Sequence, residues 1–168
     1  GCKTILEKTG VVADENSGLA PEELMRVIGE YDGLIVRSST QVTERVIGAA
    51  RRLRVIGRAG TGVDNIDVGA ATRRGIVVTN TPGSMADAVA DLTFALLLAA
   101  VRHVVAGNEN VKAGGVYDVP IGEDLASLTL GLVGCGHIGA ETVRRARAFK
   151  MPVLVEDPWV DPQRIRDL

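Results

Sequence analysis

The stretch Leu130-Gly-Leu-Val-Gly-Cys-Gly-His-Ile-Gly139 decides the fold of this 168-residue chain. It joins an apolar run to a GxGxxG pattern, and a helix-like segment follows over Ile138–Lys150. In such a motif Gly134 permits a tight turn, Gly136 lets a pyrophosphate approach the backbone, and Gly139 lets helix and strand pack closely. The N–H groups at the start of the helix attract phosphate. The stretch predicts a dinucleotide-binding βα unit; a tight turn without a ligand is the alternative.

Asp157 strengthens this prediction because it ends the next apolar run, Pro152–Glu156. An acid at that position binds the adenosine ribose hydroxyls. It also repels a 2′-phosphate: unit charges roughly 4 Å apart cost about 1 kcal/mol in water and about 4 kcal/mol at an effective dielectric of 20. NAD is therefore favoured over NADP, although an ordinary strand-end aspartate is the alternative. His137 lies in the phosphate loop, which favours a pyrophosphate contact over catalysis.

Short β-rich runs alternate with helix-like stretches along the first half of the chain. The runs are Val11–Ala13, Leu34–Val36, Val55–Ile56 and Ile76–Val78, and the helices are Pro21–Tyr31, Thr43–Ala50 and Asp67–Arg74. This alternation predicts an α/β fold with a parallel sheet and helices on both faces. Strands this short and apolar fit burial on both sides. The second half starts a new unit, with strands at Thr129–Val133 and Pro152–Glu156.

Asn80-Thr81-Pro82-Gly83 interrupts the alternation and predicts a boundary or hinge, because the residue before a proline is held extended. A long helix is expected from Met85 to about Val105. Its middle, Leu92–Val101, is apolar nearly all round. That pattern fits either a core helix of one domain or a helix packed between domains or subunits. Gly107–Pro120 is expected to be irregular.

Composition excludes several functional classes. Lys+Arg 19 against Asp+Glu 21 gives a net charge of −2, so no basic surface is expected for nucleic acid or an anionic membrane. Aromatic residues at 3% argue against base stacking. Cys2 and Cys135 are too few for a zinc cluster and fit a reduced, cytoplasmic protein. The longest apolar run, Phe94–Val101, is too short to span a bilayer.

A second constellation, Arg58-Ala-Gly-Thr-Gly-Val-Asp-Asn-Ile-Asp67, follows another predicted strand. Ligands of doubly wound sheets bind beyond the carboxyl ends of strands, where this loop and Arg37 are expected. The glycines can expose N–H groups to an anion, and Arg37 and Arg58 can bind a carboxylate or phosphate. The alternative is a glycine-rich turn before a helix capped by Asp64 or Asn65.

Four segments, in the same order, resemble the D-isomer-specific 2-hydroxyacid dehydrogenases, most closely their phosphoglycerate branch. They are Leu34–Thr40, Val55–Asp67, Gly75–Gly83 and Leu130–Gly139. The resemblance implies a flavodoxin-like substrate-binding lobe over residues 1–81, followed over 82–168 by the first part of a Rossmann-like NAD-binding lobe. It also implies a homodimer through the helix around 85–105.

The same resemblance assigns site residues. Thr61 would contact the nicotinamide end of NAD, and Arg37, Arg58, Gly60 and Thr61 would bind the substrate anion. The pyrophosphate and ribose contacts would come from Gly134, Gly136, His137, Ile138, Gly139 and Asp157. Asp91 stands where many members have Glu. The family's opening strand has no counterpart before Cys2, and its catalytic Arg, Glu and His fall beyond Leu168. No catalytic residue is therefore assigned, and the chain alone is expected to be inactive.

The resemblance implies an oxidoreductase that transfers hydride between NAD(H) and a small D-2-hydroxy acid, with 3-phosphoglycerate as one candidate. A non-catalytic NAD-sensing or dimerising module is the alternative. An S-adenosylmethionine-dependent transferase shares the glycine loop and the acid, but it leaves the Arg58–Gly62 segment without a role.

Overall fold

The structure is a computed structural model that describes residues 2–116 and 120–168. The chain divides into two compact units, Gly1–Pro82 and Gly83–Leu168. Each unit has its own parallel sheet, as the alternation of runs predicts. The assignment of the units to substrate and cofactor stays a prediction.

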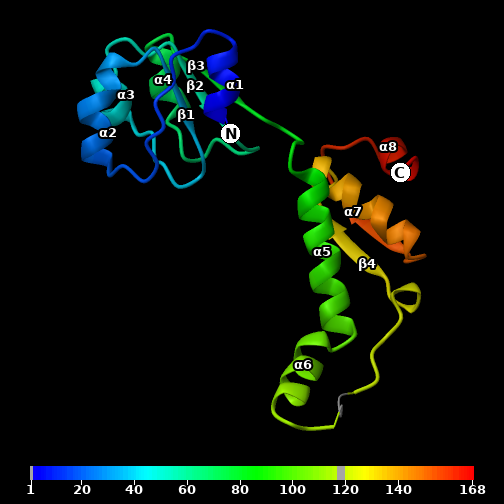
Figure 1. Cartoon of the computed structure of the whole chain (residues 1–168). Helices are drawn as coiled ribbons and strands as arrows, with labels where there is room; N and C mark the ends of the chain where they lie inside the picture. The colour runs from blue at the N-terminus through cyan, green and yellow to red at the C-terminus, as the bar shows by residue number, and fades with distance from the viewer. Residues whose placement is uncertain (1, 117–119) are drawn as a thin grey trace. The chain divides into compact units, whose positions relative to one another are not determined.

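Unit 1 is built on three parallel strands in the order β1-β2-β3, with Ile56 paired to Leu34 on one side and Val78 on the other. The strands are β1 (Gly33–Val36), β2 (Val55–Arg58) and β3 (Val77–Asn80). The helices are α1 (Cys2–Lys8), α2 (Pro21–Val27), the 3₁₀ turn η1 (Ile28–Glu30), α3 (Glu44–Ala49) and α4 (Val68–Arg73). Figure 1 shows α2, α3 and α4 gathered beside the strands. The α/β class with parallel strands is confirmed.

The core of unit 1 lies on one face of this sheet. Ile56 is fully buried there against Val46 and Ile47 of α3 and Ala71 of α4. The alternate strand residues point to the opposite face and remain largely exposed; they are Ile35, Val55 and Val77. The prediction that the strands are buried on both faces is therefore wrong for this unit. The helices α2, α3 and α4 all contribute their apolar residues to the same core cluster.

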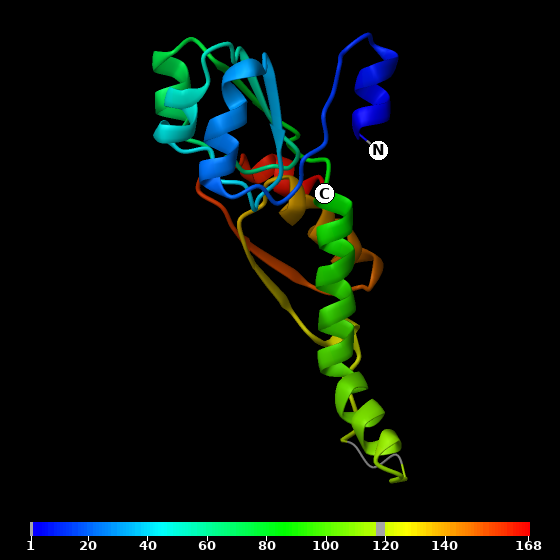
Figure 2. The ribbon, with the colours of Figure 1, turned by 60° about the vertical axis from the view of Figure 1, so that its left-hand side comes forward.

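The predicted strand at Val11–Ala13 is wrong. These residues form no strand, and Val12 is almost fully exposed. The N–H of Val11 instead donates to the carbonyl of Leu6 in a turn after α1. Helix α1 buries none of its residues, and Figure 2 shows an extended segment joining it to the rest of unit 1. An apolar run becomes a strand only where a neighbouring strand completes its hydrogen bonds.

Unit 2 places the glycine motif between a strand and a helix, as expected. Strand β4 (Leu130–Val133) pairs in parallel with β5 (Val153–Glu156), and α7 (His137–Ala148) connects them. The other elements are α5 (Ala86–Val101), α6 (Val104–Lys112), the 3₁₀ turn η2 (Leu125–Ser127) and α8 (Pro162–Arg166). Helix α5 packs along α7 in Figure 1. Phe94 of α5 stacks on Phe149, with ring centroids 5.3 Å apart.

The single long helix expected over 85–105 is interrupted. Helix α5 ends at Val101, His103 adopts a left-handed conformation with φ 52°, and α6 continues after a bend of 61°. Nor is α5 buried all round, because Leu92 is 58% and Leu96 63% exposed. Its buried stripe is Ala86, Ala90 and Phe94, at the spacing of one helix face.

Part of the segment Gly107–Pro120, expected to be irregular, is helical, since α6 extends to Lys112. The prediction for residues 117–119 lies outside the described residues. Among the residues that the structure describes, no single helix is long and apolar enough to cross a membrane. The pair α5 and α6 reaches that length and apolarity only together, across its bend.

The C-terminus of α7 generates a stability prediction. Lys150 has φ 61°, and two backbone bonds close the helix there: Lys150 N–H to Arg147 O and Met151 N–H to Ala146 O. This is the Schellman arrangement that favours glycine, because a β-carbon is strained at positive φ. We expect Lys150→Gly to raise the free energy of unfolding by about 1 kcal/mol and Lys150→Val to lower it. Urea denaturation of both variants measures this; a destabilised glycine variant would contradict it.

Candidate functional site

The turn between β4 and α7 has the geometry that its glycines predict. Gly134 takes a positive φ of 92°. A β-carbon on Gly139 would overlap the carbonyl of Gly134, so only glycine allows this close approach of helix and turn. A β-carbon on Gly136 would meet nothing within 4 Å, which leaves open space beside the loop. Contact of these residues with a ligand stays a prediction.

The first turn of α7 is an uncapped set of donors. Gly136 is the N-cap residue and supplies no side-chain hydrogen bond to the helix. The first N–H groups of an α-helix have no partner within the helix. Together with the positive end of the helix dipole, they can bind an anion. A helix of twelve residues carries this dipole, and the open space at Gly136 gives an anion access to it.

Asp157 lies directly after β5, and its carboxylate is the polar centre of this end of the sheet. One oxygen accepts the N–H of Cys135, in the glycine turn, at 2.6 Å. The other accepts the N–H groups of Trp159 and Val160 at 2.8 and 3.0 Å. These bonds, with that from Cys135 the strongest, hold the pKa of Asp157 below its ordinary value. Its stabilising effect is thus present at neutral pH and is lost as the pH falls through that lowered pKa.

His137 and Cys135 do not stand free in the glycine turn. A β-carbon on Gly83 would lie 3.1 Å from Cδ2 of His137, so the imidazole packs against this glycine at the start of unit 2. The Cys135 side chain is buried, and burial raises the pKa of its thiol. A thiol of raised pKa is a poor nucleophile. Ile138, in the first turn of α7, remains 41% exposed.

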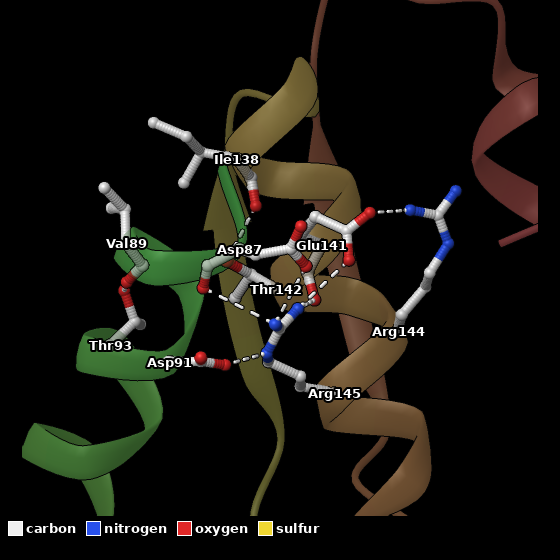
Figure 3. Close-up of polar contacts among 9 residues, drawn as sticks. All are labelled: Asp87, Val89, Asp91, Thr93, Ile138, Glu141, Thr142, Arg144 and Arg145. Carbon is white, nitrogen blue, oxygen red and sulfur yellow. Dashed lines mark hydrogen bonds and ion pairs between the residues drawn. The ribbon is translucent and has the colours of Figure 1, made fainter. Parts of the chain in front are cut away.

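A polar cluster fixes α7 to α5 (Figure 3). The guanidinium of Arg145 on α7 donates to Asp91 at 2.7 Å and to Asp87 at 3.1 Å, both on α5, and to Glu141 on its own helix at 3.0 Å. Its pKa is raised by these carboxylates, with Asp87 the largest cause. Sequence reasoning singled out Asp91 alone and missed Arg145. The spacing of Asp87 and Asp91, one turn apart on α5, was the available signal.

The loops that follow the three strands of unit 1 are tied together by two asparagines. The buried Asn65 donates through Nδ2 to the carbonyls of Arg37 at 2.9 Å and Thr40 at 2.7 Å. Asn80 donates to the carbonyl of Thr61 at 2.6 Å. The backbone of the candidate substrate residues is therefore held by side chains that sequence reasoning did not assign to the site.

The helix caps differ from those predicted. Asp64 or Asn65 was the expected cap of the helix after the glycine-rich loop, but Asp67 performs this role. Its carboxylate accepts the N–H of Ala70 at 2.8 Å. Asn65 instead donates to the carbonyls of Arg37 and Thr40 in the loop after β1. Helix α4 begins only at Val68, three residues later.

Arg58 lies over the loop at Gly60. Gly60 has φ 151°, and a β-carbon there would overlap the guanidinium of Arg58. The Nε of Arg58 is buried and has no hydrogen-bond partner in the described part of the chain. A buried donor without an acceptor is costly, which makes this atom a candidate for binding an anionic group. Arg37 and Thr61 are exposed in the same unit, whereas the glycine turn and Asp157 belong to unit 2.

Comparison with known proteins gives the family. The model of the D-isomer specific 2-hydroxyacid dehydrogenase catalytic domain matches residues 2–150. The chain belongs to this family. It is 41% identical over 164 residues to the D-3-phosphoglycerate dehydrogenase of Archaeoglobus fulgidus, a match that covers 97% of this chain and 31% of that protein. The chain thus spans about a third of the length of this dehydrogenase.

Solved structures share the fold. The TT0316 protein from Thermus thermophilus matches with a TM-score of 0.87 and 38% identity, over 95% of this chain and 53% of that one. The NAD⁺-bound 3-phosphoglycerate dehydrogenase of Entamoeba histolytica matches with a TM-score of 0.79 and 32% identity, over 96% and 49%. The glycine turn therefore lies within a fold for which a structure with bound NAD⁺ is known.

The Arg145 cluster gives a second prediction. Arg145→Met keeps the length of the side chain but removes its bonds to Asp87, Asp91 and Glu141, so we expect a lower unfolding temperature. Arg144→Met is the matched control, since the more exposed Arg144 has its ion pair with Glu141, on its own helix. We expect the control to lose clearly less stability, because exposed ion pairs contribute little. Calorimetric unfolding of the two variants compares them; equal losses would mean that the cluster does not anchor α7.

Proposed function

We propose that this chain forms the cofactor-binding and substrate-anion-binding parts of an NAD-dependent D-2-hydroxyacid dehydrogenase, an oxidoreductase acting on the CH–OH group of a small acid. The observation that carries the proposal is the β4–α7 turn, in which uncapped helix N–H groups, open space at Gly136 and the carboxylate of Asp157 occur together. Family membership supports it. A cytoplasmic location is part of the proposal.

The residues of unit 2 fit NAD. The pyrophosphate would lie at the start of α7, beside Gly134, Gly136, His137, Ile138 and Gly139. Asp157 would accept a hydrogen bond from the adenosine ribose hydroxyls through Oδ2, which accepts only the N–H of Cys135, whereas Oδ1 already accepts two N–H groups. When bound, the nicotinamide ring supplies the hydride chemistry, and the protein orients it.

The lowered pKa of Asp157 favours NAD over NADP. The amides that keep this carboxylate ionised also keep its negative charge where a 2′-phosphate would lie. Repulsion between two anions at close range costs about 1–4 kcal/mol, depending on the local dielectric. The structural relative from Entamoeba histolytica was solved with NAD⁺, which agrees with this choice.

Unit 1 supplies groups for an anionic substrate. Arg58 offers a buried Nε without an acceptor in the described residues. Gly60, two residues later, has a φ of 151°, and its lack of a β-carbon leaves room for the Arg58 guanidinium. Arg37 and Thr61 are exposed and are held through backbone carbonyls by Asn65 and Asn80. Guanidinium groups bind carboxylates and phosphates through charge-assisted hydrogen bonds. A 2-hydroxy or 2-keto acid fits these groups, and two arginines favour a phosphorylated acid such as 3-phosphoglycerate.

A second candidate function is a non-catalytic NAD-sensing or dimerising module. The observation that favours it is the exposed apolar side of α5, where Leu92 and Leu96 are more than half exposed. We propose a homodimer through this helix in either case. Large apolar side chains left exposed along one helix face are typical of an interface.

Cofactor selectivity tests the proposed function. We expect calorimetric titration of the chain to give saturable NADH binding and about tenfold or weaker NADPH binding. Asp157→Asn should weaken NADH binding and reduce the preference, because it removes the charge. The matched control is Asp161→Asn, at the exposed cap of α8. A folded chain that binds neither cofactor would overturn the assignment.

Turnover and assembly test two further parts of the proposal, the inactivity of the chain alone and the homodimer. We expect no NADH oxidation by the 168-residue chain with any 2-keto acid, because no catalytic residue is assigned within it. Sedimentation should show a dimer that Leu96→Asp shifts toward monomer by roughly tenfold or more in dissociation constant. Measurable turnover would contradict the first expectation; a wild-type chain that is monomeric would contradict the dimer, and an unchanged assembly of the Leu96 variant would contradict an interface through α5.

A further inference from the structure

Trp159 is the one tryptophan of the chain, and its side chain is 93% exposed. Tryptophan has one of the largest apolar surfaces of any side chain and is highly buried on average. The aromatic contacts of the unit 2 core do not use it, since Phe94 and Phe149 stack on each other there. The indole is therefore available to a ligand.

The position of Trp159 is fixed through Asp157. The N–H groups of Trp159 and Val160 both donate to one oxygen of the Asp157 carboxylate. Pro158 lies between Asp157 and Trp159, and its ring restricts the backbone of this turn. The other carboxylate oxygen is bonded to Cys135 in the glycine turn. One side chain thus joins the phosphate loop to the backbone that carries the indole.

We propose that the indole of Trp159 forms the stacking surface for the adenine ring of NAD. The inference rests on the proposed function, in which Asp157 binds the ribose hydroxyls. Adenine is attached directly to that ribose, so the adenine ring lies close to the groups that the Asp157 carboxylate binds. The carboxylate holds the backbone of Trp159 at 2.8 Å. Bases stack readily on exposed aromatic side chains, because both present flat π-faces.

Fluorescence of the wild-type chain gives the first test, because all indole emission comes from Trp159. ADP-ribose is the probe, since it carries the adenine and both riboses but no nicotinamide. We expect saturable quenching by ADP-ribose, as stacking on adenine produces. Nicotinamide mononucleotide is the control ligand, and we expect no saturable change with it.

Two variants extend the test to affinity. Trp159→Ala should weaken ADP-ribose and NADH binding by about tenfold, the loss typical of one base–aromatic stack, whereas Trp159→Phe should retain most of the affinity. Folding should be unaffected, because the side chain is exposed. Ile121→Ala is the matched control: Ile121 is 98% exposed in the same unit and lies far along the chain from the turn.

The outcomes separate the inference from the function on which it rests. If the wild-type chain binds no NADH in calorimetry, the proposed function fails, and the inference fails with it. If NADH and ADP-ribose bind, but the Trp159 emission does not change and Trp159→Ala binds as tightly as wild type, the inference alone is overturned. Quenching with a matching loss of affinity in Trp159→Ala, and not in Ile121→Ala, supports both.

Discussion

The convergence of three backbone amides on the carboxylate of Asp157 is the constraint on which the candidate site depends. The Cys135 amide belongs to the glycine turn, and the Trp159 and Val160 amides belong to the segment after β5. Two loops at the carboxyl ends of neighbouring parallel strands are thereby held in one arrangement. The same bonds keep the carboxylate ionised, so the group that shapes the site also provides its charge.

This arrangement needs a rigid support, which α7 receives from α5. The buried stripe Ala86, Ala90 and Phe94 supplies apolar packing, and Arg145 adds directional bonds to two aspartates of α5. Small side chains at the first two positions allow α5 to lie close to its neighbour. Directional bonds then fix the register of the two helices, which apolar packing alone specifies less sharply. The same contacts fix the position of the glycine turn, because the turn leads directly into α7.

Sequence reasoning predicted the features that depend on neighbouring residues, and missed those that depend on distant partners. The strands β1 to β5, the helix after the glycine motif and the tight turn at Gly134 follow from local patterns and are confirmed. The strand expected at Val11–Ala13 failed because pairing requires a partner that no local pattern supplies. Asn65 looked like a helix cap, but its amide bridges two loops. Arg145 pairs with residues more than fifty positions away; the spacing of Asp87 and Asp91 indicates a shared helix face but not its distant partner.

The two units carry different binding groups, each within its own fold. Unit 2 offers uncapped N–H groups and an ionised carboxylate, which suit a dinucleotide, and unit 1 offers a buried guanidinium donor without an acceptor, which suits an acid. In the described chain the first N–H groups of α7 have no side-chain cap, and Nε of Arg58 has no hydrogen-bond partner. A buried donor without an acceptor, such as Nε of Arg58, calls for an explanation, and binding of an anionic group is one. Donors in both units are what the proposed function requires, because hydride transfer needs a cofactor and an anionic substrate together.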